Sequence, residues 1–177
     1  NQNLDQFMLW YSQAGTPKVK VNERYDENTL TLDFEQILPS NRTKKLQPMV
    51  IPISIGLLDE NGADLIETKV FELKKPRDTL TFKGIEKKPT VSLLRKFSAP
   101  VIIEREITDQ DRLTLLTKDN DAYNRWDASQ QLMLASFEKI AIQKQEPNDE
   151  LINAFCQIMQ DQKIMPAFRA QLLSQPS

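Results

Sequence analysis

Apolar and polar residues alternate with a period of two along most of residues 16–106, which is the pattern of half-buried β-strands. The alternating apolar positions are Val19, Val21, Leu30, Leu32, Phe34, Met49, Ile51, Ile53, Ile55, Leu57, Leu80 and Phe82. Polar clusters such as Asp26–Asn28 and Asp59–Gly62 separate the runs and predict turns. Two further runs, "KVFEL" and "APVIIERE", complete a set of six or seven short strands. This pattern predicts an antiparallel β-sandwich of the immunoglobulin-like class.

One proline interrupts the longest of these runs. Pro52 lacks a backbone N–H, so its strand should lie at a sheet edge or contain a bulge.

After Ile107 the apolar period changes from two to 3.6, which predicts a series of helices. Thr108, Asp121 and Asn148 are suitable N-caps for three of them, and Pro166 suits the first position of a fourth. The expected buried stripes are Trp126, Ser129, Met133, Phe137 and Ile140 in the second helix, and Leu151, Ile152, Phe155 and Met159 in the third.

A short helix is also predicted over residues 3–13, because Leu4, Phe7, Met8 and Tyr11 have helical spacing. The predicted fold is thus β plus α: a short N-terminal helix stub, the β-sandwich, and an α-helical array.

Composition narrows the classes of partner. The chain has 177 residues, of which 40% are hydrophobic and 27% are charged, as in globular proteins. Its formal charge of −2 provides no electrostatic footprint for nucleic acid or an anionic membrane. No apolar run reaches the length of a membrane span, and the first residues, "NQNLDQFMLWYSQAG", lack the pattern of a signal peptide. The single cysteine fits a reducing compartment, so we expect a cytoplasmic location, although exported proteins without disulfides look the same.

The chain contains no histidine, which is the commonest metal ligand and general base. A Ser-His-Asp triad and an H-E-x-x-H zinc motif are therefore excluded within this sequence. Acidic loops beginning at Asp59 and Asp119 fail as EF-hand calcium sites, because Val70 and Gln130 occupy the position that requires glutamate.

Two other candidates favour structural interpretations. Glu104 and Glu106 lie two apart on one predicted strand, where a solvated face is more plausible than a catalytic pair. Cys156 lies between apolar residues of a predicted helix, and we expect it to be a small buried residue. We therefore expect no catalytic, cofactor-binding or metal-binding residue in this chain.

Three motifs carry a family resemblance: "WYSQAGTP" (Trp10–Pro17), "LLRKFSAPV" (Leu93–Val101) and "DAYNRWDASQ" (Asp121–Gln130), with "IPISIGLLD" (Ile51–Asp59) in order between the first two. In these the chain resembles the bacterial aminopeptidase N family of zinc-dependent alanyl aminopeptidases, which are hydrolases. The similarity extends from about Leu4 to Ser177.

The resemblance implies a place within a larger metallopeptidase. Residues 1–14 would be the terminal helix of a preceding catalytic domain, residues 15–107 the β-sandwich domain, and residues 108–177 the first helices of the C-terminal helical domain. The family's H-E-x-x-H and G-A-M-E-N motifs are absent from this sequence, so no catalytic or zinc-binding residue can be carried over. Zinc would belong to the parent enzyme, and the partners would be the rest of the parent chain, which alone would meet the peptide substrate.

Within "LLRKFSAPV" we expect Leu93, Leu94 and Phe97 to be buried anchors, and Arg95 and Lys96 to lie at the rim. The serine-alanine-proline turn should then direct the chain into the final strand.

Two functions remain open at this point. The first is a non-catalytic spacer fragment of a zinc aminopeptidase. The alternative is a free-standing β-sandwich module that binds a peptide or protein on a sheet face or edge. Exposed apolar stripes on the first and last helices would look the same in both. An independent hydrolase lacks any visible site.

Overall fold

The computed structural model describes residues 4–39, 46–146 and 148–176, and the chain divides into two compact units. The first unit comprises Asn1–Asp59 and Asp64–Glu106, and the second comprises Glu60–Ala63 and Ile107–Ser177. Residues 1–3 of the predicted helix stub and residue 177 of the predicted helical array lie outside the described residues.

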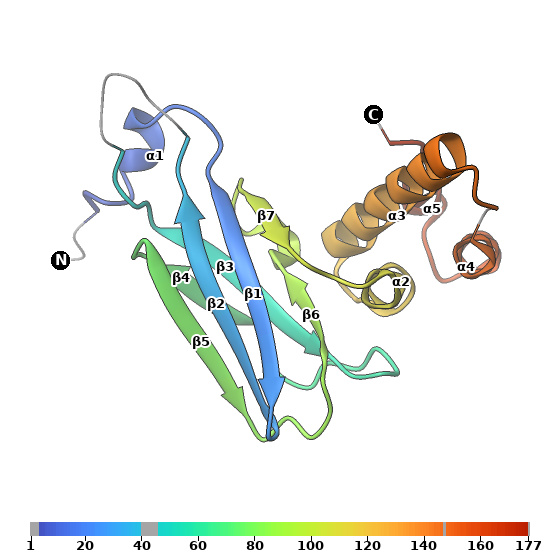
Figure 1. The fold of residues 1–177 in the computed structure, drawn as a ribbon, viewed down its shortest axis with the longest axis horizontal. Helices are drawn as coiled ribbons and strands as arrows, with labels where there is room; N and C mark the ends of the chain where they lie inside the picture. The colour runs from blue at the N-terminus through green and yellow to red at the C-terminus, as the bar shows by residue number, and fades with distance from the viewer. Residues whose placement is uncertain (1–3, 40–45, 147, 177) are drawn as a thin grey trace. The chain divides into compact units, whose positions relative to one another are not determined.

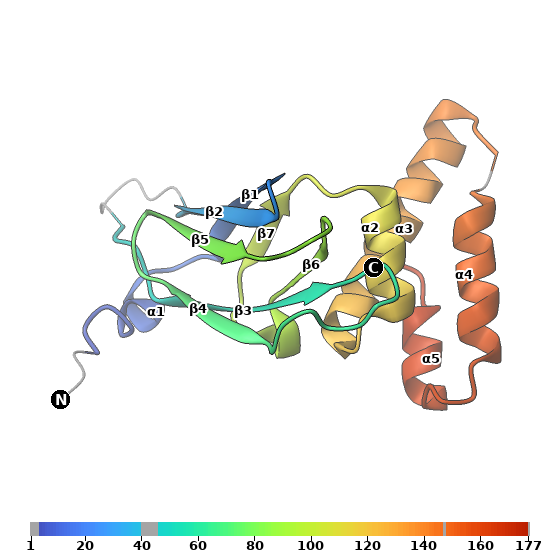
Figure 2. The ribbon, with the colours of Figure 1, turned by 90° about the horizontal axis from the view of Figure 1, so that it is seen from below.

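The first unit contains a four-stranded sheet in the order β5-β2-β1-β7 and a three-stranded sheet in the order β4-β3-β6 (Figures 1 and 2). The strands are β1 Lys18–Asp26, β2 Thr29–Ile37, β3 Ile51–Leu58, β4 Lys69–Leu73, β5 Arg77–Lys83, β6 Thr90–Leu93 and β7 Ile102–Arg105. Neighbouring strands are antiparallel, except that β7 runs parallel to β1. The predicted immunoglobulin-like sandwich is confirmed, although β6 was not identified as a strand from the sequence.

The alternating apolar residues form the core between the two sheets. Those that are at most 2% exposed include Val19, Val21, Leu30, Leu32, Phe34, Met49, Ile51, Ile53, Ile55 and Leu57. Across the core, the rings of Phe34 and Phe71 stack with their centroids 5.0 Å apart. The strand period therefore identified the buried face correctly, since a residue and its second neighbour point to one side of a sheet.

The strand that contains Pro52 is not an edge strand, because β3 lies between β4 and β6. However, β3 pairs with β4 over Ile51–Ile55 and with β6 only over Ile55–Leu58. Pro52 thus has a paired neighbour on one side only, and its missing N–H removes no ladder hydrogen bond to β6.

The stretch after β6 corrects a second prediction. Leu93 and Leu94 are buried as expected, but Arg95 is only 3% exposed and Phe97 is 51% exposed. Leu94, Lys96 and Phe97 adopt left-handed backbone conformations, with φ of 55°, 58° and 51°. These conformations reverse the direction of successive side chains, so the basic residue turns inward and the aromatic residue turns outward.

The N-terminal helix is shorter than predicted, with α1 spanning Leu9–Ser12 after a turn, and it lies at one end of the sandwich (Figure 1). Side chains of this helix and of the turn before it are hydrogen-bonded to the sandwich. Gln6 Nε2 donates to the carbonyls of Pro48 (3.0 Å) and Lys74 (2.6 Å), and Trp10 Nε1 donates to the carbonyl of Val50 (2.9 Å).

The second unit contains four helices: α2 Asp109–Lys118, α3 Ala122–Gln143, α4 Asp149–Gln160 and α5 Pro166–Leu172. The predicted N-caps are confirmed, because Thr108, Asp121 and Asn148 each accept a hydrogen bond from a backbone N–H of the first turn. Pro166 occupies the first turn of α5, where its missing N–H costs nothing. Within the described residues, none of the helices combines the length and apolarity needed to cross a bilayer.

The predicted stripes of α3 and α4 were only partly correct. The buried residues are Asn124, Ala128, Ser129, Leu132 and Met133 in α3, and Leu151, Ala154 and Ile158 in α4. The larger Phe137, Ile152 and Met159 are 47%, 46% and 57% exposed, and Cys156 is exposed rather than buried. The packed faces combine large residues such as Leu132 and Ile158 with small ones such as Ala128 and Ala154, so they are rotated from the predicted stripes.

Candidate functional site

A buried arginine forms the centre of one polar cluster of the sandwich. The Arg95 guanidinium donates to Ser92 Oγ (3.0 Å), Thr68 Oγ1 (3.0 Å) and Asp64 Oδ1 (2.6 Å). It also lies against the backbone of β3 at Gly56, where an added Cβ would be 2.0 Å from Arg95 Cζ. This side chain ties β6 to β3 and to the segment before β4.

A second cluster joins the two sheets through an amide. Gln36 of β2 is 8% exposed, and its Nε2 donates to the carbonyls of Met49 (2.8 Å), Leu73 (3.0 Å) and Lys75 (3.2 Å). Its Oε1 accepts from the Met49 N–H at 3.0 Å. One side chain therefore satisfies several backbone groups on the two sides of the core.

A third cluster joins the sheets at Arg105 of β7. Its Nη1 is 2.9 Å from Glu23 Oε1 on β1 and donates to the carbonyl of Val91 on β6 at 2.8 Å. The sequence carried a signal for two of these clusters, because Gln36 and Arg105 fall in phase with the inward-facing apolar residues of their strands. A polar residue at such a position needs a buried partner.

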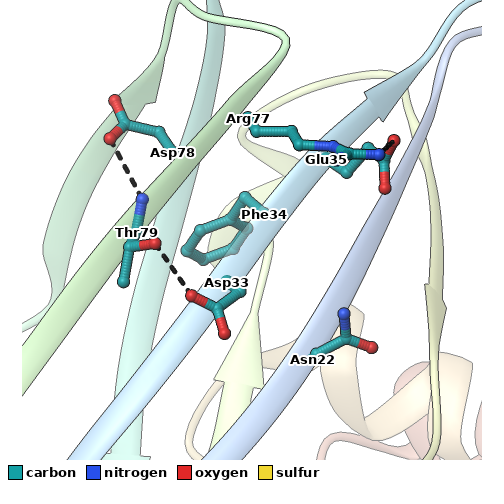
Figure 3. Close-up of a pocket in the computed structure, with 7 residues that line it drawn as sticks. All are labelled: Asn22, Asp33, Phe34, Glu35, Arg77, Asp78 and Thr79. Atoms are coloured by element: carbon teal, nitrogen blue, oxygen red, sulfur yellow. Dashed lines mark hydrogen bonds and ion pairs between the residues drawn. The ribbon is translucent and has the colours of Figure 1, made fainter.

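A shallow depression of about 540 Å³ lies on the four-stranded sheet, lined by residues of β1, β2 and β5 (Figure 3). Its charged groups pair with one another or with charged residues beside the depression. Arg77 pairs with Glu35 (2.6 Å), and Asp33 accepts from Thr79 Oγ1 (2.8 Å) and pairs with Arg24 (2.7 Å). Exposed cross-strand pairs of this kind are typical of a hydrated sheet face and do not indicate a ligand site.

In the helical unit, the "DAYNRWDASQ" stretch holds the helices together. Arg125 Nε donates to the carbonyl of Leu116 in α2 (2.9 Å), and its guanidinium lies 5.8 Å from the ring centroid of Phe168 in α5. Burial lowers the pKa of Arg125, and the charges of Asp161 and Asp119 oppose that shift. The motif is therefore explained by helix packing.

Two further polar contacts stabilise this unit. Ser129, which is fully buried in α3, donates to the Leu172 carbonyl at the end of α5 (2.5 Å). Asp109 lies 2.9 Å from Lys139 Nζ, and this hydrogen bond is the main cause that lowers the pKa of Asp109 below its ordinary value.

The residues weighed from the sequence do not converge on a centre. Glu104 pairs with Lys18 at 2.6 Å, and Asp121 caps α3. In the described ranges, no three His, Cys, Asp or Glu residues are placed to hold a metal ion. Zinc sites are built from these residue types, so the donors among the described residues do not fit one. That no residue here is catalytic stays a prediction.

Two family models match the chain. "Domain of unknown function (DUF3458) Ig-like fold" matches residues 15–106, and "Domain of unknown function (DUF3458_C) ARM repeats" matches residues 109–177.

Curated relatives match as well. Aminopeptidase N of Escherichia coli (strain K12) is 33% identical over 193 residues, which cover 100% of this chain and 22% of the relative. Aminopeptidase N of Caulobacter vibrioides is 34% identical over 181 residues, covering 99% of this chain and 21% of the relative. The crystal structure of Legionella pneumophila aminopeptidase A in complex with aspartic acid has a TM-score of 0.87 and 28% identity, covering 99% of this chain and 20% of that chain.

The chain thus spans about a fifth of the length of these relatives. Its motifs, its sandwich followed by helices, and these similarities agree, and the chain belongs to the aminopeptidase N family as an Ig-like domain followed by a helical region.

Proposed function

We propose that this chain is a non-catalytic spacer within a larger zinc aminopeptidase, where it connects a catalytic domain to a helical domain. The observation that carries the proposal is that the whole chain aligns with about a fifth of aminopeptidase N. The parent enzyme would remove residues from the N-termini of peptides, with zinc activating the attacking water. The chain's own residues would provide rigidity and none of the zinc ligands.

The buried polar groups of the sandwich support a structural role. Arg95, Gln36 and Arg105 are all directed at backbone or side-chain groups of the same unit. Catalytic groups, in contrast, are directed at a cleft that substrate can enter. A sandwich fastened in this way is suited to hold two larger domains at a fixed separation.

The N-terminal helix supplies a face for the catalytic domain. The exposed apolar residues of α1 and of the turn before it form one stripe: Leu4, Phe7 and Met8 before the helix are 59%, 44% and 53% exposed, and Tyr11 in the helix is 79% exposed. The opposite, polar side is already hydrogen-bonded to the sandwich. We assign the stripe to the catalytic domain of the parent, because a helix with apolar residues on its outer side needs a cover.

A chimera tests this function. The segment of E. coli aminopeptidase N that aligns with this chain would be replaced by the 177 residues, and release of alanine from alanyl p-nitroanilide would be measured. We expect a folded chimera to retain activity within about tenfold of the parent, because a spacer needs only its shape and its interfaces. The matched control carries Phe7→Ser and Tyr11→Ser, which should weaken the docking of the stripe. A folded chimera without activity would contradict the proposal.

The isolated chain provides the complementary assay. We expect it to release no amino acid from alanyl p-nitroanilide and to retain no stoichiometric zinc after gel filtration. Release in proportion to chain concentration would overturn the proposal.

The alternative is a free-standing β-sandwich module, for which the same exposed stripe would be a binding site for another protein. The two functions differ in one result: a free module would bind a separate partner without any aminopeptidase domain present. We also propose a cytoplasmic location, supported by a single cysteine whose thiol is exposed.

A further inference from the structure

The tip of the loop after β3, residues Glu60–Ala63, belongs to the helical unit. Strand β3 ends at Leu58, and Asp64 returns to form an isolated bridge with Leu58. Of the five residues between them, Asp59 stays with the sandwich, and Glu60–Ala63 belong to the same compact unit as Ile107–Ser177. The helical unit is therefore built from two separate stretches of chain.

Within this unit, Gly62 packs against the last residue of α2. A Cβ added to Gly62 would lie 2.4 Å from Lys118 Cβ and 3.0 Å from the Lys118 carbonyl oxygen. These atoms belong to the helix backbone and the root of the side chain, so no rotation about a side-chain bond removes the clash. Lys118 Nζ also donates to the Glu60 carbonyl at 2.5 Å.

Backbone conformation adds a second requirement for glycine at this position. Gly62 has φ of +86°, a region that side chains with L configuration rarely adopt. The neighbours Glu60, Asn61 and Ala63 also take part in interactions, so the tip is not a loose loop.

We infer that Glu60–Ala63 is an integral part of the helical unit, which would not be complete with residues 107–177 alone. The chain then passes between the two units at three places: 59/60, 63/64 and 106/107. Local opening of α2 must release the tip, so the stability of the helices depends on a residue that the sequence assigns to the sandwich. This holds whatever function the chain has.

Two glycines of the same chain provide a matched test. Gly84 also has a positive φ, +75°, but among the described residues, its two chain neighbours apart, no heavy atom lies within 4 Å of the position that its Cβ would occupy. Gly62→Ala and Gly84→Ala therefore share the backbone cost, and only the first adds the clash with α2. Hydrogen exchange of the native full chain, followed by mass spectrometry, would report opening of α2 and α3 for each variant.

We expect Gly84→Ala to change exchange in α2 and α3 by less than about twofold, because it lies in the other unit. We expect Gly62→Ala to raise exchange there by about tenfold or more, since a single unfavourable backbone conformation and a core-like clash each shift a folded equilibrium by about 5- to 30-fold. Equal exchange of the helices in the two variants would overturn the inference.

Two further variants keep the test decisive if Gly62→Ala does not fold. Lys118→Gly removes the Cβ at 2.4 Å, so its combination with Gly62→Ala should recover part of the lost protection. Lys118→Ala removes the bond to Glu60 and should raise exchange of the tip amides by about threefold or more. The inference would be contradicted if Gly62→Ala and Lys118→Gly had additive effects on hydrogen exchange of the helices. It would also be contradicted if Lys118→Ala left the exchange of the tip amides unchanged.

Discussion

Replacing Gln36 with leucine should separate the two sheets of the sandwich at one side. The substitution is close in size and keeps the strand, but it removes an amide that satisfies the Met49 N–H and the carbonyls of Met49 and Leu73. Met49 is 1% exposed and Leu73 is not exposed, so water does not readily replace the amide.

The expected cost follows from these contacts. Three buried hydrogen bonds at about 1 kcal/mol each, plus about 1 kcal/mol for stranding the Met49 N–H, amount to about 4 kcal/mol. Burying the leucine side chain returns about 1 kcal/mol. Gln36→Leu should therefore lower the free energy of unfolding by about 3 kcal/mol, a large share of the roughly 5–15 kcal/mol that stabilises a domain.

Urea unfolding followed by tryptophan fluorescence would measure this loss. Trp10 belongs to the first unit and Trp126 to the second, so a Trp126→Phe background makes Trp10 the reporter of the sandwich. The matched control is Gln13→Leu, because Gln13 makes the same reciprocal pair of bonds to the Gln47 backbone at an exposed site (2.9 and 2.6 Å). We expect the control to lose less than about 1 kcal/mol, since water replaces exposed hydrogen bonds. Equal losses for the two variants would refute the reasoning.

Three other predictions concern single side chains. Gly56→Ala should displace the Arg95 guanidinium and cost about 3 kcal/mol or more in the same assay, and a neutral result would mean that the guanidinium moves freely. Arg105→Met should cost about 3 kcal/mol by leaving its carboxylate partner unpaired between the sheets; stability within 1 kcal/mol of the parent would show that the pair is dispensable. The pKa of Asp109 is lower in the folded chain, chiefly through its hydrogen bond to Lys139, so its stabilisation is complete above the unfolded value near 3.8 and is lost as pH falls through the folded value. Between pH 5 and 2, the unfolding temperature of the helices should thus fall less steeply in Asp109→Asn than in the parent. Parallel curves of unfolding temperature against pH for the two proteins would contradict this.

Local patterns were sufficient for most of the strands, for the last four helices and for much of the core. The alternation of Leu30, Leu32 and Phe34 identified a strand and its buried face, because side chains repeat every two residues whatever the neighbours are. Thr108 and Asn148 were recognised as caps because their bonds are made within one helical turn. Where the controlling geometry spans only a few residues, the sequence by itself determined the result.

Tertiary structure decided which side of each element meets another. Phe137, Ile152 and Met159 are apolar at helical spacing, yet they are exposed, since the neighbouring helix and not the periodicity selects the contact. In the same way, left-handed conformations around Arg95 turned it inward, where Gly56 leaves room for its guanidinium.

The sequence by itself determined the fold class, the starts of the last four helices and the absence of histidine chemistry within this chain. Only the tertiary structure placed Gln36 and Arg105 between the sheets and grouped Gly62 with α2. The physical reason is the range of the interactions: strand period and capping act between near neighbours, whereas a buried hydrogen bond or a backbone contact depends on partners brought together from distant parts of the chain.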